Sequence, residues 1–175
     1  DRRVGKRATS KRWSSRLHRA VCGINAAAFP RPVTLQSAAI PYRIEPTGSV
    51  SVLLVTSRTR RRWILLKGKI GRGLDAAQSA GREALEEAGV TGRIVPDAIG
   101  RYRQPGRSIL GFVANLRIEA FALEVEAELA DWPERHQRER CWFTVASARR
   151  VVMDAQLRQV LRAFERWIAS GKARQ

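Results

Sequence analysis

Residues 82–90 read Arg-Glu-Ala-Leu-Glu-Glu-Ala-Gly-Val, and they are the most informative stretch of this 175-residue chain. On a helix, Glu83, Glu86 and Glu87 stand at positions i, i+3 and i+4, so their carboxylates share one face. Three carboxylates at such short distances raise one another's pKa unless a cation lies among them. Hard oxygen ligands of this kind suit Mg²⁺ or Mn²⁺, which bind carboxylate and phosphate oxygens together. The stretch therefore indicates a divalent metal site, and its alternative is a solvated acidic face with Arg82 as ion-pair partner.

A glycine-rich loop comes before this stretch, because residues 68–73 read Gly-Lys-Ile-Gly-Arg-Gly. The spacing that follows predicts a helix over Ala76–Ala88, with Asp75 as its N-cap and Gln78 completing a capping box. Gly89 stands where a left-handed residue ends a helix. The three carboxylates are thus expected on a helix that follows a glycine loop.

The rest of the chain has mostly the two-residue period of strands. Short β-rich runs are expected at Ser37–Ile44, Val50–Thr56, Trp63–Leu66, Arg93–Arg103, Ile109–Val125 and Arg140–Phe143. The chain closes with an amphipathic helix over Asp154–Ala169, whose apolar face is formed by Leu157, Leu161, Phe164 and Ile168. Strands flanked by two main helices predict a layered α/β domain.

Positive charge is concentrated at the start of the chain. The net charge is +17, which implies a polyanionic partner such as a phosphate-rich small molecule, nucleic acid or an anionic membrane surface. Residues 1–36 hold nine Lys and Arg but one acid, Asp1. Residues 12–24 form an amphipathic stripe, which fits a helix docked on the domain, a membrane-surface segment or an organelle presequence. We expect residues 1–36 to be a basic, partly helical extension and linker, and residues 37–170 to be the folded domain.

Cysteine content and hydropathy exclude several classes of protein. Cys22 and Cys141 are the only cysteines, and no Cys-x-x-Cys or Cys/His cluster is present, so a disulfide framework and a zinc site are excluded. No apolar run approaches the roughly 20 residues that span a bilayer. A reducing compartment fits, and we expect the protein in the cytoplasm. The sequence does not fix an oligomeric state.

The loop and helix together resemble the Nudix box, which is Gly, five residues, Glu, seven residues, then Arg-Glu-apolar-x-Glu-Glu-x-Gly-apolar. Gly68 opens the box here, Arg82 follows fourteen residues later, and Gly89-Val90 close it. One position departs, because Leu74 stands where the family usually has Glu. In the family that Glu often bonds the box Arg or supports the metal shell, so its loss affects the orientation of Arg82.

The resemblance implies a fold, a cofactor and residue roles. It implies a Nudix-type α/β/α sandwich with a mixed central sheet, here with the basic N-terminal extension, and a metal-dependent hydrolase. The implied catalytic residues are Arg82, Glu83, Glu86 and Glu87. The implied Mg²⁺ ligands are the three glutamates and the Gly68 carbonyl, with Mn²⁺ as a substitute metal. Which carboxylate acts as general base stays open.

Further resemblance narrows the group within the family. Residues 52–58 and 62–64, and then 131–132 and 138–143, look like diphosphoinositol polyphosphate phosphohydrolases and dinucleoside polyphosphate hydrolases. The similarity covers roughly residues 36–165. It implies a Mg²⁺-dependent pyrophosphohydrolase that cleaves a diphosphate linkage in a diphosphoinositol polyphosphate, a dinucleoside polyphosphate or another nucleoside-diphosphate-linked substrate. The alternative is a catalytically weak Nudix-like module that binds RNA or another polyanion.

Cationic side chains around the box are candidates for phosphate binding, because guanidinium groups donate paired hydrogen bonds to phosphates. They are Arg58, Arg62, Lys67, Lys69, Arg138 and Arg140, with Arg103 and Arg107 as weaker candidates on an expected hairpin loop. Each is open to the alternative of an ordinary surface residue.

Four further expectations concern single residues. Glu124 is a candidate for an additional metal ligand or base from a late strand. His136, in a polar loop, is expected at the surface. Cys141 is expected to be a buried small hydrophobic residue. Trp63 and Trp142 are expected to pack in the core.

Overall fold

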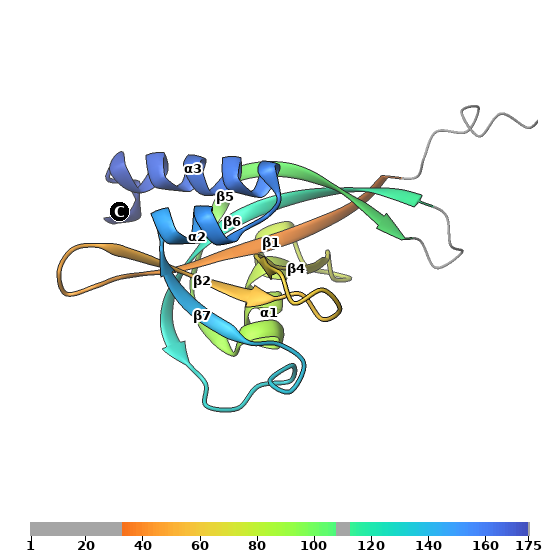
Figure 1. Cartoon of the computed structure of the whole chain (residues 1–175), viewed down its shortest axis with the longest axis horizontal. Helices are drawn as coiled ribbons and strands as arrows, with labels where there is room; N and C mark the ends of the chain where they lie inside the picture. Colours follow the sequence, from red (N-terminus) through yellow and green to blue (C-terminus); the bar gives the residue numbers. More distant parts are fainter. Residues whose placement is uncertain (1–32, 108–112, 175) are drawn as a thin grey trace, which may run out of the picture. The chain divides into compact units, whose positions relative to one another are not determined.

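One mixed sheet of seven strands organises the computed structural model, which describes residues 33–107 and 113–174 (Figure 1). The strands are β1 (Val33–Ile44), β2 (Val50–Thr56), β3 (Trp63–Ile64), β4 (Leu66–Lys69), β5 (Val90–Arg107), β6 (Val113–Glu128) and β7 (Arg140–Thr144). The main order is β3-β2-β1-β6-β5, with β4 pairing β1 and β7 pairing β2. β1 runs parallel to β6 and antiparallel to β2 and β4, so the sheet is mixed.

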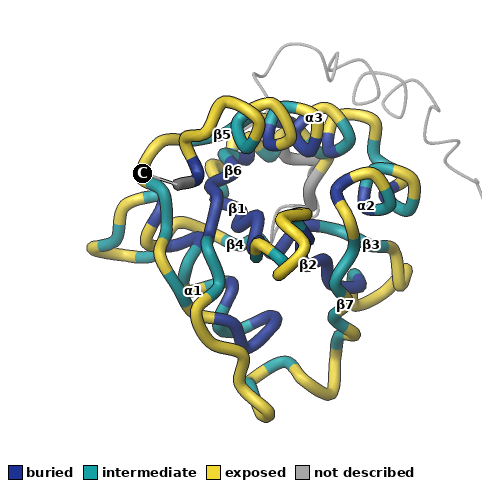
Figure 2. The backbone as a smooth tube through the Cα atoms, turned by 90° about the vertical axis from the view of Figure 1, so that its left-hand side faces the viewer, coloured by how far each residue is buried: buried dark blue, intermediate teal, exposed yellow. Residues whose placement is uncertain are grey.

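Helices cover both faces of this sheet. Helix α1 (Ala76–Ala88) packs on one face through its small buried residues Ala77, Ala80, Ala84 and Ala88. The other face carries α2 (Val145–Val151) and α3 (Ala155–Ala169), followed by a 3₁₀ turn, Lys172–Arg174. There Tyr42 packs against Phe164 and Trp167 of α3. The expected α/β/α sandwich is confirmed, and Figure 2 shows the buried residues along β1 and β2 between the helix layers.

Helix α1 has the boundaries and caps that its sequence predicts. The Asp75 carboxylate accepts a hydrogen bond from the Gln78 backbone N–H at 2.7 Å, and the Gln78 side-chain oxygen accepts one from the Asp75 backbone N–H at 3.1 Å. Gly89 ends the helix with φ +63°, a left-handed conformation that suits glycine. These local signals fix where the glutamate face begins and ends.

Several strand boundaries differ from the expectations. β1 begins at Val33 rather than Ser37, and the run expected at Trp63–Leu66 is two strands that meet at Leu65. β5 continues through Arg107, so Arg103 and Pro105 lie in a strand rather than in a hairpin loop. Pro105 is tolerated because β5 pairs with β6 alone in the described part of the chain, where it is an edge strand.

One further expectation was wrong, and one helix was not predicted. Cys141 is exposed rather than buried. It lies on β7, which pairs with β2 alone among the described strands, and it is the adjacent Trp142 and Phe143 that reach the core clusters. Helix α2 was not expected, although Thr144 caps it by accepting the Ser147 N–H at 3.2 Å. The expected helix over residues 12–24 lies outside the described residues. Within the described residues, no helix is long and apolar enough to cross a membrane.

Candidate functional site

Two glycines of the loop after β4 make room for side chains of α1. A Cβ added at Gly68 would fall on the carboxylate of Glu83, and one added at Gly71 would lie 2.5 Å from the guanidinium of Arg82. The Gly71 N–H also donates to Ser79 Oγ of α1 at 3.0 Å. The loop backbone is therefore seated directly against the box residues of the helix.

The three glutamates of α1 lie in different environments. The exposed fraction of the side chain is 13% for Glu83, 46% for Glu86 and 5% for Glu87. Burial raises the pKa of Glu83, and the neighbouring Glu86 carboxylate raises it further. Burial raises the pKa of Glu87 to about 7, although Arg138 and the Lys67 N–H oppose the shift. Burial is thus the main reason why Glu83 and Glu87 hold a proton more tightly than a carboxyl group in water.

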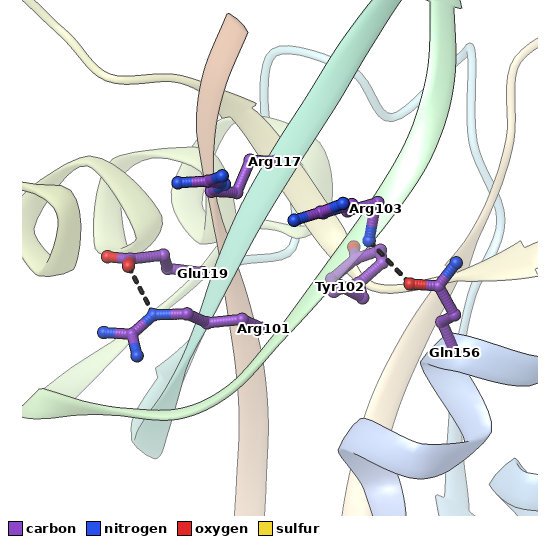
Figure 3. Close-up of a pocket in the computed structure, with 6 residues that line it drawn as sticks. All are labelled: Arg101, Tyr102, Arg103, Arg117, Glu119 and Gln156. Carbon is purple, nitrogen blue, oxygen red and sulfur yellow. Dashed lines mark hydrogen bonds and ion pairs between the residues drawn. The ribbon is translucent and has the colours of Figure 1, made fainter. Parts of the chain in front are cut away.

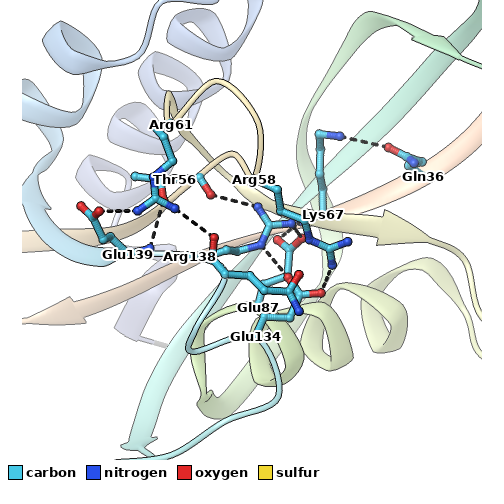
Figure 4. Close-up of polar contacts among 10 residues, drawn as sticks. Gln36, Thr56, Arg58, Arg61, Lys67, Glu87, Glu134, Arg138 and Glu139 are labelled. Atoms are coloured by element: carbon cyan, nitrogen blue, oxygen red, sulfur yellow. Dashed lines mark hydrogen bonds and ion pairs between the residues drawn. The ribbon is translucent and has the colours of Figure 1, made fainter.

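Glu87 is the centre of a polar network beneath the helix (Figure 4). Its carboxylate accepts the Lys67 backbone N–H at 3.0 Å and forms an ion pair with Arg138. Arg138, whose side chain is 8% exposed, also donates to Glu134 at 2.6 Å and to the Thr56 carbonyl at 3.0 Å. Each of the three guanidinium nitrogens of Arg138 therefore donates to a protein acceptor, and the side chain links β2, α1 and the loop before β7.

Glu134 is a member of this network that the sequence did not single out. Its carboxylate accepts from both Arg58 and Arg138, and its backbone N–H donates to the Glu86 carbonyl at 3.1 Å. Burial would raise its pKa, but the two arginines outweigh burial and hold the pKa below its usual value. The i, i+4 spacing of Glu134 and Arg138 is the sequence signal that could have identified it.

Arg140 also has structural contacts next to the site. Its guanidinium donates to the carbonyls of Ala88 and Leu129 and stacks over the Trp132 ring at 4.0 Å. Trp132 in turn lies against Gly89, where any Cβ would lie 2.8 Å from the Trp132 side chain. Arg140 and Trp132 thus anchor the end of α1.

The remaining cationic candidates lie nearer solvent. Lys67 is half-buried, burial lowers the pKa of its ammonium group, and Nζ lies 3.4 Å from Gln36 Oε1. Lys69 is exposed at the end of β4, and Arg62 is exposed between β2 and β3. Arg58 is exposed and pairs with Glu134. Arg58 joins the network through Glu134 and Arg138 lies within it, whereas Arg140 contacts the end of α1.

Leu74 departs from the family pattern, and Glu124 does not lie where a metal ligand was expected. The half-buried Leu74 offers no carboxylate, and Arg82 pairs with Glu83 and Glu86 of its own helix, at 3.8 and 3.5 Å. Glu124 pairs in register with Tyr42, so it faces the α3 side of the sheet, where it forms an ion pair with Arg93 at 2.7 Å. The structure therefore separates Glu124 from the box. His136 is exposed, as expected.

Glu83 and Glu86 have the donor chemistry for a hard divalent cation. Within the described residues, no three His, Cys, Asp or Glu side chains already form a cluster that could hold a metal ion. Arg82 and Arg138 instead neutralise the glutamates in this structure. Gly68 leaves its backbone open to Glu83, and the adjacent Ser37 Oγ is buried without a hydrogen-bond partner among the described residues. These features fit a cation that replaces Arg82 between Glu83 and Glu86.

Comparison with known proteins gives the family. The family model of the NUDIX domain matches residues 34–167. The chain is 33% identical over 147 residues to Nudix hydrolase 12, mitochondrial, of Arabidopsis thaliana, covering 75% of this chain and 72% of that protein. It is 34% identical over 153 residues to Nudix hydrolase 13, mitochondrial, of the same plant, covering 77% and 75%. The fold is shared with a C. elegans Ap4A hydrolase binary complex, at TM-score 0.60 and 22% identity, over 78% of this chain and 98% of that chain. The chain belongs to the Nudix hydrolase family.

Proposed function

We propose that this protein is a Mg²⁺-dependent pyrophosphohydrolase that cleaves a diphosphate linkage in a polyphosphorylated substrate. The observation that carries the proposal is the seating of Gly68 and Gly71 against Glu83 and Arg82, which brings the box carboxylates to one loop-helix junction. A bound Mg²⁺ would activate water and neutralise charge that develops on the phosphate. Mn²⁺ is the expected substitute metal.

Each box residue has a distinct task in this proposal. Glu83 and Glu86, with the Gly68 carbonyl, would hold the metal. Glu87 holds the Lys67 backbone and the Arg138 side chain in place, so it positions the residues around the proposed metal site. It would bind the metal itself only if Arg138 moved away from its carboxylate. Arg82, released from Glu83 and Glu86, would be free to contact substrate phosphate.

The proposed substrates are dinucleoside polyphosphates, diphosphoinositol polyphosphates and other nucleoside-diphosphate-linked compounds. The net charge of +17 supports a substrate rich in phosphate. The name of the C. elegans structural neighbour, an Ap4A hydrolase, supports the dinucleoside class. The proposed phosphate contacts are the exposed Arg58, Arg62 and Lys69 and the half-buried Lys67.

The proposed compartment is the cytoplasm. The competing assignment is the mitochondrion, since both plant relatives carry that word in their names and residues 1–36 are rich in arginine. Imaging a fluorescent fusion that retains residues 1–36 distinguishes the two.

A Nudix-like module that binds RNA or another polyanion without turnover is the second candidate. Leu74 favours it, because Arg82 lacks the usual Glu partner and pairs instead with the carboxylates that would hold the metal. Binding without hydrolysis across a substrate panel would select this candidate.

The deciding experiment measures product release from a panel of dinucleoside polyphosphates, diphosphoinositol polyphosphates and nucleoside-diphosphate-linked compounds. Wild type should turn over at least one class with Mg²⁺ or Mn²⁺ and lose activity in excess chelator. Glu86→Gln removes an anionic ligand and should lower kcat at least a hundred-fold. Arg162→Gln on the exposed surface of α3 is the matched control and should retain full activity. Full activity of wild type in chelator would refute the metal mechanism.

A further inference from the structure

Helices α2 and α3 carry a cluster of arginines on the sheet face opposite to the box. The two helices lie side by side on that face (Figure 1) and together contain five arginines and one acid, Glu165. A hollow of about 270 Å³ is formed by residues of both helices, and it is lined by Ala146, Arg149, Arg150, Arg158 and Arg162. Since no acidic side chain is among these lining residues, positive charge is concentrated at the hollow.

Three of the four lining arginines have no acidic partner within the described part of the chain. Arg158 donates to the carbonyls of Val152 and Met153, at 3.0 Å each, and thereby holds the end of α2. Arg150 donates to a serine hydroxyl of its own helix at 2.9 Å. Arg162 is exposed and forms no ion pair with any described residue. Their charges are therefore available to a ligand.

Arg149 is the fourth lining arginine and the one with an acidic partner, Glu165, at 2.8 Å. Its Nε is buried and has no hydrogen-bond acceptor among the described residues. A buried donor without a partner costs about 1–3 kcal/mol. The cluster thus has more N–H donors than the described residues provide acceptors, which favours an anionic ligand rich in oxygen atoms.

The larger arginine-lined hollow of the described chain differs from this one in its acid content. It measures about 730 Å³ and lies over β5 and β6 (Figure 3). There Arg101 forms an ion pair with Glu119 at 2.6 Å, and Glu119 itself lines the hollow. A carboxylate in the lining repels a phosphate group, and this repulsion is absent from the lining between α2 and α3.

We infer that the arginine cluster of α2 and α3 binds the phosphate backbone of a single-stranded nucleic acid. Guanidinium groups suit phosphates because they donate two parallel hydrogen bonds to the phosphate oxygens. The lining contains no aromatic side chain that could stack on a base, so the contacts are made to the backbone and do not depend on base sequence. Because the sheet separates the cluster from α1, a bound strand does not compete with a substrate of the box.

The dimensions of the cluster fit one strand rather than a duplex. Helix α2 has seven residues and is therefore about 10 Å long. Arg158 and Arg162 are four residues apart on α3, which is about 6 Å along the helix axis. A domain that binds double-stranded RNA spans about 16 base pairs and contacts two successive grooves. A cluster of this length instead contacts a few successive phosphates of one strand.

The apolar content of the two helices argues against other anionic partners. A helix that binds a membrane surface inserts an apolar face, but the apolar face of α3 is buried in the core. Met153, 63% exposed, is the one exposed large apolar side chain of residues 145–174. A protein partner needs large apolar or aromatic anchors, and Ala146 is the only apolar residue of the lining. A nucleic-acid backbone needs only the cations.

The test measures binding of fluorescein-labelled oligouridine to the full chain by fluorescence anisotropy, at several salt concentrations and in excess chelator. The double variant Arg150→Gln, Arg162→Gln removes two exposed cations without acidic partners. It should weaken binding about five-fold or more and lower the log–log salt slope by about 1.4 units, since each phosphate contact to a single strand contributes about 0.7. Thermal melts check folding. If the double variant is destabilised, Arg162→Gln alone should lower the slope by about 0.7 units.

The matched control is the double variant Arg93→Gln, Arg101→Gln, which removes the same charge from exposed arginines that each pair with an acid of β6. It should change the slope by less than about 0.5 units. Equal loss of binding in the two folded double variants would overturn the site, because net charge alone would then explain it.

Vesicles of phosphatidylserine and phosphatidylcholine test the competing membrane surface. Loss of vesicle binding in Arg150→Gln, Arg162→Gln, with oligouridine binding intact, would overturn the nucleic-acid site and assign the cluster to a membrane. The oligouridine titration in chelator involves no turnover. A failure of the proposed hydrolysis would therefore leave the site standing, and a failure of the site would leave the hydrolysis standing.

Discussion

Arg138 and Glu87 form the buried ion pair on which the local geometry of the box depends. Both side chains are less than 10% exposed, so their charges are removed from water and must be satisfied by protein groups. Arg138 meets this need with three acceptors, in Glu87, Glu134 and the Thr56 carbonyl. Arg138, which the sequence offered as a phosphate contact, holds the helix that carries the box glutamates against β2 and the loop before β7.

Arg138→Gln should therefore destabilise the protein strongly, because it leaves Glu87 buried without its cation. A loss of about 3–5 kcal/mol in the free energy of unfolding is expected for breaking a buried pair from one side. Arg58→Gln is the matched control, since Arg58 pairs with the same Glu134 but is 53% exposed, and it should change stability by less than about 1 kcal/mol. Urea denaturation of both variants measures the difference. Equal, small losses would show that the pair does not support the fold.

The raised pKa of Glu87 gives the metal-free protein a pH-dependent stability. A carboxyl group with a pKa of about 7 in the folded state and 4.5 in the unfolded state binds protons more tightly when folded. The free energy of unfolding should thus fall by up to about 3 kcal/mol as pH rises from about 4.5 to 7. The charged groups next to Glu87 are Arg138 and Glu134. Denaturation in chelator at several pH values checks this, and Glu87→Gln should flatten the profile. A metal-free stability that increases over this range would contradict the shift.

Helix α1 and its preceding loop were predictable because their signals are local. The capping pair Asp75 and Gln78 and the left-handed Gly89 lie within a few residues of the ends that they define. The extent of β5 was not predictable, since Pro105 reads as a turn unless its strand is known to be an edge. Glu134 was missed for a similar reason, because its partner Arg58 is 76 residues away and only the fold brings them together.

Gly68→Ala tests the contact between loop and helix. The added Cβ would fall on the carboxylate of Glu83, so the side chain must leave its position beside the loop, and kcat should fall at least ten-fold. Gly81→Ala is the matched control, because a Cβ there meets nothing within 4 Å and replaces a helical glycine. It should retain activity and gain about 0.5–1 kcal/mol of stability. Steady-state kinetics and thermal melts report the two effects separately. Full activity of Gly68→Ala would show that turnover does not depend on the position of the Glu83 side chain against the loop.

At the scale of the molecule, the described helices cover the two sheet faces to different extents. The α2 and α3 face is a packed core around Tyr42 and Phe164, whereas the α1 face leaves the outer ends of β1, β5 and β6 open. The fold class followed from the alternation of strands and helices, but the open face did not. Leu35, Arg103 and Arg117 are far apart in the sequence, and only the register of β1, β6 and β5 aligns them.

The last prediction separates the basic extension from the chemistry. Residues 1–36 contain nine of the 33 Lys and Arg, yet the family model begins at residue 34. Deleting residues 1–30 should leave turnover of a small diphosphate substrate within a few-fold of the full chain. Binding to long polyanions should weaken, and its log–log salt slope should fall by roughly one unit for each phosphate that the shortened protein no longer neutralises. Kinetics, salt-dependent binding to a homopolymeric RNA and thermal melts of both proteins measure this. A truncated protein that melts at the wild-type temperature but is inactive would place part of the active site in the extension.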